Sequence, residues 1–330
     1  MKLKVVCTLA GNTSSSRPVW LAAALIGLIL PRAALAQLDP SAIRSIQADR
    51  VEAATILGGD FGIAGASYRD DNKNTIDISK FGGSGDVGDP KPLFDSGIKW
   101  QPRVQGNMGY LVGKNTFRSG DLEGDTSKYF TYAIQFGGGA RFWFNEHLSL
   151  APTLMGMYGH THNNYIATSA AGRAAYQDAD QAGLINWNVD TWTVRPSGEL
   201  TWIQNFGRVI VTLSSEGTYF HTEDFGGSDK HPSVNGNSET WKNKIDVDIP
   251  LGVMVFNHEL RTGGYFCRTE FYGDLEDGLG WDHEYEIHYR LVLDFLGELW
   301  KVKWLGVGAS YLWGNDFNGY SFGVDAAFRF

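Results

Sequence analysis

Long stretches of this sequence alternate between apolar and polar residues. At the end of the chain every second residue is apolar or aromatic: Tyr320, Phe322, Val324, Ala326, Phe328 and Phe330. The residues between them are polar or small. Successive side chains of a strand point to opposite faces of a sheet, so this period predicts a strand with one apolar face. The period recurs in 98–112, 132–144, 241–255 and 285–295, which predicts an all-β chain.

These segments are long for a water-soluble sandwich. Globular strands usually have about 5–6 residues, whereas a tilted strand that crosses a bilayer needs about 9–11. Aromatic residues gather near the ends of the segments, as in the girdles that flank the apolar band of membrane barrels. The alternation predicts twelve strands, at 53–68, 73–82, 96–112, 129–144, 148–161, 187–204, 208–221, 240–256, 259–273, 283–296, 300–313 and 317–330.

The connections between these strands alternate between short and long. The short ones are 145–147, 205–207, 257–258 and 297–299, and the long ones are 113–128, 162–186, 222–239 and 274–282. This rhythm is typical of outer-membrane barrels. The sequence therefore predicts a 12-stranded antiparallel transmembrane β-barrel with short periplasmic turns, long extracellular loops and both termini on the periplasmic side. Strand 73–82 and the long connection 83–95 fit this rhythm least.

The polar faces of the predicted strands carry charges of both signs. We expect the following residues to line the lumen: Lys99, Arg103, Arg141, Arg195, Glu199, Glu216, Lys242, Lys244, Asp246, Asp248, Arg268, Glu270, Glu286, His288, Arg290 and Asp294. One interpretation is a network of ion pairs that fills and stiffens a mid-sized barrel. The other is a selective pore, but charge-selective pores use rings of one dominant sign. The mixture of signs favours the first.

The first 36 residues have the order of a secretory signal peptide. Basic residues precede the apolar run 19–30, which is too short to span a bilayer, and Ala34 and Ala36 form a small-residue cleavage site. Cleavage after Ala36 would remove four basic residues and change the net charge from −9 to −13. A chain this acidic is not expected to bind nucleic acid.

A short segment, 37–52, separates this leader from the predicted barrel, 53–330. Asp39, Pro40 and Ser41 could begin a helix in this segment. We expect it either to lie in the lumen as a helix or to form a periplasmic tail. Cys267 is the only cysteine outside the leader, so no intrachain disulfide is possible. The predicted register turns Cys267 toward lipid as a small apolar residue.

Four stretches of the chain resemble the translocator β-domain of autotransporters, in particular the solitary type without a passenger. They are 185–202, 239–252, 271–287 and 307–330. In that family the outer-membrane assembly machinery reads the last strand with its C-terminal aromatic residue. The resemblance implies this task for Tyr320, Phe322, Phe328 and Phe330. Because only 37–52 precedes the first predicted strand, the secretion role is not expected to apply.

The sequence contains no pattern that indicates an enzyme or a metal site. His160 and His162 share one strand face, but no third ligand follows at a fixed spacing. Asp282 and His283 are adjacent, and adjacent strand residues face opposite sides, so we expect no dyad. The G-x-S-x-G pattern of hydrolases is missing from the sequence. We therefore expect no enzymatic activity and no cofactor.

The resulting expectation is an integral outer-membrane barrel with a structural role in the cell envelope. A narrow channel for ions or small solutes is the alternative, and a hydrolase embedded in the barrel is a third, less favoured hypothesis. The expected partners are outer-membrane lipid, lipopolysaccharide and the assembly machinery. We expect the protein to be a monomer.

Overall fold

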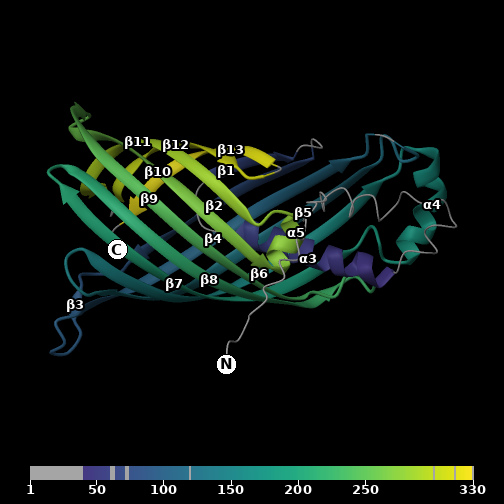
Figure 1. Cartoon of the computed structure of the whole chain (residues 1–330), viewed down its shortest axis with the longest axis horizontal. Coiled ribbons are helices and arrows are strands. Elements are labelled where there is room, and N and C mark those ends of the chain that lie inside the picture. The colour runs from purple at the N-terminus through teal and green to yellow at the C-terminus, as the bar shows by residue number, and fades with distance from the viewer. Residues whose placement is uncertain are drawn as a thin grey trace, which may run out of the picture.

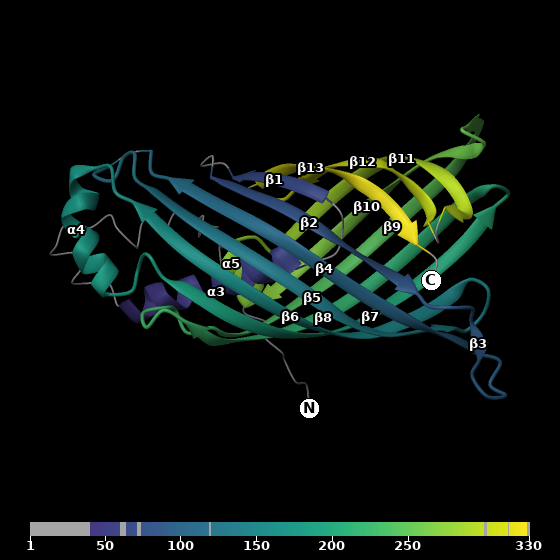
Figure 2. The same ribbon diagram turned by 180° about the vertical axis from the view of Figure 1, so that it is seen from behind.

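The structure, a computed structural model, describes residues 40–59, 64–70, 74–118, 120–299, 302–315 and 317–328. Strongly tilted antiparallel strands form a long barrel around a helix (Figures 1 and 2). The long strands are β1 (Ala64–Asp70), β2 (Thr75–Asp86), β4 (Lys99–Thr116), β5 (Thr126–Trp143), β6 (Leu148–Ile166), β7 (Asn188–Phe206), β8 (Val209–Gly227), β9 (Asn235–Val255), β10 (His258–Gly273), β11 (His283–Leu299), β12 (Val302–Trp313) and β13 (Phe317–Phe328).

The sheet closes on itself at its first two strands. Strand β1 pairs with β13 on one side and with β2 on the other, and β2 pairs with β4. Closure leaves these long strands without a free edge, which is how a sheet satisfies its backbone groups in lipid. A two-residue strand, β3 (Lys91–Pro92), pairs with β4 beside this ring. The predicted 12-stranded antiparallel barrel is confirmed.

One end of the barrel carries most of the short turns. Between β9 and β10 the chain turns at Phe256 and Asn257, which both have positive φ, as in the two-residue turns that fit twisted hairpins. Between β5 and β6, Asn145 Oδ1 accepts hydrogen bonds from the backbone N–H groups of His147 and Leu148. The exception is the connection 87–98, which contains β3 and is long, as the sequence indicates for this region.

The opposite end carries the long connections, 117–125, 167–187, 228–234 and 274–282. Helix α4 (Ala170–Gln181) lies in the second of these loops, and helix α5 (Asp274–Leu279) lies in the last. Ser169 caps α4, because its side chain accepts a hydrogen bond from the Gly172 N–H at 2.8 Å. The connection between β12 and β13 is short even though it lies at this end.

Helix α3 (Pro40–Gly59) replaces the first seven residues of the predicted strand 53–68. The prediction was wrong here because the apolar residues Ala53, Ile56 and Leu57 are spaced three and four apart, which suits a helix face. Ala53 and Ile56 are buried in the largest hydrophobic cluster, where α3 and α5 meet the inner wall. Strand β1 begins only at Ala64.

The direction of α3 corrects a second expectation. Near its start, the Arg44 side chain donates to the Ala182 carbonyl in the long β6–β7 loop. At its end, the Gly59 carbonyl accepts a hydrogen bond of 2.9 Å from Asn107 of β4, well inside the barrel. The helix therefore enters from the long-loop end, and the N-terminus of the described chain does not lie with the C-terminal strand's end as predicted (Figure 1).

Candidate functional site: the lumen and its helix

The barrel is apolar outside and polar inside. Phe136, Tyr289 and Phe322 point outward and are 73%, 62% and 68% exposed. Exposed apolar side chains on other strands, among them Leu154, Leu200 and Ile245, extend this surface into a band around the wall. None of the helices in the described part of the chain has the length and apolarity that a membrane crossing requires.

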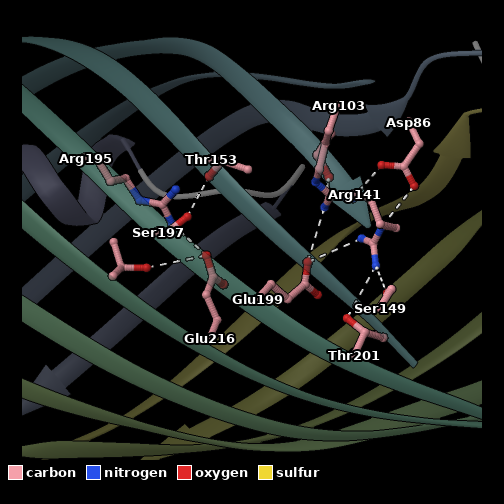
Figure 3. A network of polar contacts seen from close by, with 12 residues as sticks. Asp86, Arg103, Arg141, Ser149, Thr153, Arg195, Ser197, Glu199, Thr201 and Glu216 are labelled. Atoms are coloured by element: carbon pink, nitrogen blue, oxygen red, sulfur yellow. Dashed lines mark hydrogen bonds and ion pairs between the residues drawn. The ribbon is translucent and has the colours of Figure 1, made fainter. Parts of the chain in front are cut away.

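Two arginines and two carboxylates form an ion-pair network in the half of the lumen nearest the short turns (Figure 3). Arg141 of β5 lies 3.1 Å from Asp86 and 3.4 Å from Glu199, and donates to the Ser149 hydroxyl at 2.9 Å. Arg103 of β4 lies 3.1 Å from the same Asp86 and 3.5 Å from the same Glu199. The shared carboxylates join β2, β4, β5 and β7 across the interior. Asp86 was not among the predicted lumen residues.

A second set of pairs continues around the wall. Arg195 of β7 contacts Glu216 of β8 at 3.2 Å, and Arg290 of β11 makes a two-pronged contact with Asp246 of β9 at 2.7 Å. Such bidentate pairs hold a planar geometry as well as charge. The first pair joins two neighbouring strands, and the second reaches across β10, which lies between β9 and β11. The pattern stiffens the wall.

A third group contains the predicted lumen residues Asp248 and Asp294 together with Arg261 and Glu259, which the sequence missed. Arg261 of β10 donates to Asp248 at 2.6 Å through Nε, and its Nη1 lies 3.7 Å from Glu259 and 3.9 Å from Asp294. The sequence signal for Arg261 is its odd-numbered position along β10. The prediction turned the even-numbered residues of this strand toward the lumen, whereas the structure turns the odd-numbered ones inward.

That inversion corrects the placement of three residues. Cys267 pairs in register with Lys244 and Glu286, so it faces the lumen and is buried rather than turned toward lipid. Arg268 and Glu270 are on the opposite, outer face, where they form an ion pair of 2.9 Å. They do not line the lumen. Apolar residues occur at both parities of this strand, so its alternation could not set the register.

A polar cavity of about 230 Å³ lies beside the end of α3, between Ile56 and the barrel wall. Lys242, Glu286 and His288 are among its lining residues. Ser310 donates to Glu286 at 2.5 Å and lies 2.8 Å from His288 Nδ1. The Ser310 hydroxyl thus contacts both a carboxylate and a histidine ring in this cavity. Tyr265 donates to the same Glu286 at 2.8 Å.

The remaining predicted lumen residues lie at the margins of these groups. The Lys244 ammonium lies 5.4 Å from the centre of the Tyr265 ring. Lys99 follows the lumenal parity of β4 but is exposed at the short-turn end. The structure thus brings most of the predicted charges together in pairs, and leaves Lys99 outside them.

Helix α3 occupies the long-loop half of the lumen. The Glu52 carboxyl is 1% exposed and accepts a hydrogen bond of 2.6 Å from Ser238 of β9. Gln47 donates to the Leu184 carbonyl at 2.8 Å. Two wall glycines make room for the helix: a Cβ at Gly109 would overlap the Gly58 carbonyl oxygen, and one at Gly236 would overlap the Glu52 carboxyl. Of the two expectations for 37–52, the described residues 40–52 follow the lumenal one.

Acidic groups gather where α3 meets α5. Burial raises the pKa of Glu52 to about 8, with Asp274 and Asp49 adding to the rise and the Ser238 hydrogen bond opposing it. Burial, Asp274 and Asp277 likewise raise the pKa of Asp49 to about 6. Both groups lie level with the loop ends of β9 and β10. The Glu52 carboxyl is therefore largely protonated at neutral pH, because burial disfavours the charged form of an acid.

Three of the four predicted assembly residues, Tyr320, Phe322 and Phe328, belong to β13. Tyr320 and Phe322 face outward from this strand, 56% and 68% exposed. Phe328 pairs with Val302 through the backbone, and Phe330 lies outside the described residues. The predicted cleavage residues Ala34 and Ala36, with the whole leader, also lie outside the described residues.

The histidines weighed as metal or catalytic groups lie at the long-loop end. His160 contacts Asp190 at 2.8 Å on the outer face, and the His162 ring lies 6.4 Å from that of Phe130. His283 does contact Asp282, at 2.6 Å, contrary to expectation, because Asp282 precedes the first residue of β11. Among the residues that the structure describes, no group of three or more metal-ligating side chains occurs.

A closed antiparallel barrel, apolar outside, charged inside and entered by a helix from its long-loop end, has the architecture of an outer-membrane β-barrel. Residues 92–323 match the family described as the solitary outer membrane autotransporter beta-barrel domain. The chain belongs to this family, whose barrels reside in the outer membrane.

Solved structures give the same fold. The β-domain of the Bordetella autotransporter BrkA is 12% identical, with a TM-score of 0.52 over 81% of this chain and 96% of that one. The transport unit of AIDA-I from Escherichia coli is 11% identical, with a TM-score of 0.53 over 88% and 100%. The NalP translocator domain from Neisseria meningitidis is 12% identical, with a TM-score of 0.51 over 94% and 100%. No curated protein matches the sequence.

Proposed function

We propose that this protein is a structural barrel of the outer membrane whose lumen is closed by its own helix α3, and that it has no catalytic activity. The observation that carries the proposal is the helix itself, which contacts strands β2, β4, β5, β6 and β9 of the wall. Paired charges of both signs line the lumen between the helix and the short-turn end. A lumen of this kind offers no ring of one sign to select ions.

The proposal includes the cellular setting that the sequence indicates. The chain is exported through a leader cleaved after Ala36 and is inserted by the outer-membrane assembly machinery. In the membrane it is a monomer. Its surroundings are outer-membrane lipid and lipopolysaccharide, and nucleic acid is not a partner. Fractionation of cells, with N-terminal sequencing of the mature protein, tests this part: a mature chain that begins at Gln37 is expected.

Electrical recording in planar lipid bilayers tests the closed lumen. The purified mature protein is expected to give no steady current, whereas a variant that lacks 40–59 should conduct because its lumen is open. A heat-dependent shift in gel mobility checks that both barrels are folded. Steady, ion-selective steps from the intact protein would contradict the proposal and support the narrow channel, for which the cavity of about 230 Å³ is the favouring observation.

The hydrolase hypothesis has a separate test. Ser310 and His288 are the serine and histidine that lie together in the lumen. The purified protein is expected to hydrolyse no ester substrate. An esterase activity that disappears in Ser310→Ala would contradict this part of the proposal.

A further inference from the structure

Two lysines on the outer face of the barrel have no counter-ion within the described part of the chain. Lys114 of β4 and Lys128 of β5 are direct partners in the antiparallel register. Direct partners have side chains on the same face, about 5 Å apart at Cβ. Lys114 is exposed and Lys128 is partly exposed. Neither ammonium group makes a hydrogen bond or an ion pair with another described residue.

Side chains on the β6 side of this pair can add hydrogen bonds. Asn164 of β6 is the register partner of Lys128 on its other side, and His162 is two residues further down the same face. The closest carboxylate by register on that face is Asp77 of β2, and it already accepts a hydrogen bond of 2.7 Å from Ser67. Like charges directly opposite each other are destabilising. An anion from outside the chain would remove this repulsion.

The position of the pair along the wall identifies the source of such an anion. Tyr110, Phe130 and Tyr132 form an outward aromatic patch, with ring centres 4.9 Å apart for the two tyrosines and 6.5 Å for Tyr110 and Phe130. Lys128 lies two residues beyond Phe130, toward the long loops. Aromatic belts mark the level of the membrane interface. The lysines therefore lie where the phosphates of outer-leaflet headgroups are found.

Two pairs of opposite charges lie elsewhere on the outer face at this end. Asp190 contacts His160 at 2.8 Å, and Arg268 contacts Glu270 at 2.9 Å. We propose that Lys114 and Lys128, assisted by Asn164 and His162, bind the phosphorylated headgroup of an outer-leaflet glycolipid. The ammonium groups would make charge-assisted hydrogen bonds to phosphate oxygens. This inference rests on the proposed membrane setting, and it does not depend on whether the lumen conducts.

Lipid binding to the purified full-length protein in neutral detergent tests the proposal, with bisphosphorylated lipid A and its dephosphorylated form as probes. The double variant Lys114→Gln/Lys128→Gln is expected to lose roughly thirtyfold in affinity for the phosphorylated probe. It should bind the dephosphorylated probe as the wild type does. The double variant Lys114→Arg/Lys128→Arg should retain binding, and Arg268→Gln on the opposite wall is the matched control.

Three outcomes would overturn the proposal. Unchanged affinity in the folded double glutamine variant would show that the lysines are not the site. An equal loss in Arg268→Gln would indicate general surface charge. Competition by free inorganic phosphate at the concentration of the lipid would assign the site to a soluble anion. Conductance recordings on the same variants separate this test from that of the closed lumen, because neither lysine side chain faces the lumen.

Discussion

The hydroxyl group of Ser238 donates a hydrogen bond of 2.6 Å to Glu52, which joins helix α3 to strand β9 of the wall. The same hydroxyl accepts a hydrogen bond of 2.9 Å from the Leu275 N–H of helix α5. Ser238 and Glu52 are both 1% exposed. One buried side chain thus links the lumenal helix, the wall and an outer loop, and it makes the closure of the lumen dependent on a few polar contacts.

Replacement of Glu52 by alanine is expected to loosen this link. The change leaves the buried Ser238 hydroxyl without its acceptor and opens a void, at a cost of roughly 1–3 kcal/mol in the free energy of unfolding. Thermal unfolding in detergent measures the loss, and bilayer recording should show transient openings. Glu52→Gln keeps the shape and an acceptor oxygen and should match the stability of the wild type at pH 6 and below, where Glu52 is protonated. Equal destabilisation in the two variants would contradict the role of this hydrogen bond.

Stability is expected to fall as the pH rises. The folded state raises the pKa of Asp49 to about 6 and of Glu52 to about 8, so it binds protons more tightly than the unfolded state. The stabilisation is complete below the unfolded pKa values near 4 and is lost as the pH rises through about 6 and then about 8. The loss between pH 4.5 and pH 9 is on the order of 5 kcal/mol, most of it from Glu52.

Unfolding midpoints across this pH range measure the effect. Glu52→Gln has no proton to lose at this position, so it should remove most of the slope above pH 6. An identical pH profile in the wild type and in Glu52→Gln would show that another group causes the dependence.

A methyl group at Gly109 is expected to displace α3. The added Cβ would overlap the carbonyl oxygen of Gly58, which is backbone and cannot rotate away. Gly109→Ala should therefore increase the conductance and expose α3 to protease from the long-loop end. Gly156→Ala is the matched control, because a Cβ there meets nothing within 4 Å. Protection of α3 equal to that in the control would mean that the helix does not need this close approach.

Removal of the Arg141 guanidinium should destabilise the short-turn half of the barrel. Arg141→Met leaves Asp86 and Glu199 with Arg103 as their shared cation, at a cost of roughly 2 kcal/mol because the pairs are only partly shielded from water. The gel-shift midpoint on heating measures this cost. Lys99 is an exposed cation of the same lumenal parity. Lys99→Met should change the free energy of unfolding by less than about 0.5 kcal/mol.

The barrel wall could be predicted because each long strand carries its own pattern. Along β11, Glu286, His288 and Arg290 alternate with outward apolar residues, and the structure places these three in the lumen. In β10, Tyr265 and Phe266 lie on opposite faces and are both aromatic. With no dominant parity, only pairing with β9 and β11 fixes which of them points inward. That pairing turned Cys267 inward and Arg268 outward.

The sequence by itself determined the strand number, the antiparallel order and the two-faced wall, because a period of two is local and repeats in almost every segment. The tertiary structure alone decided that α3 enters from the long-loop end and that Glu52 meets Ser238. These features depend on residues far apart in the chain that fit one closed interior. No local pattern specifies the volume inside a barrel or what fills it.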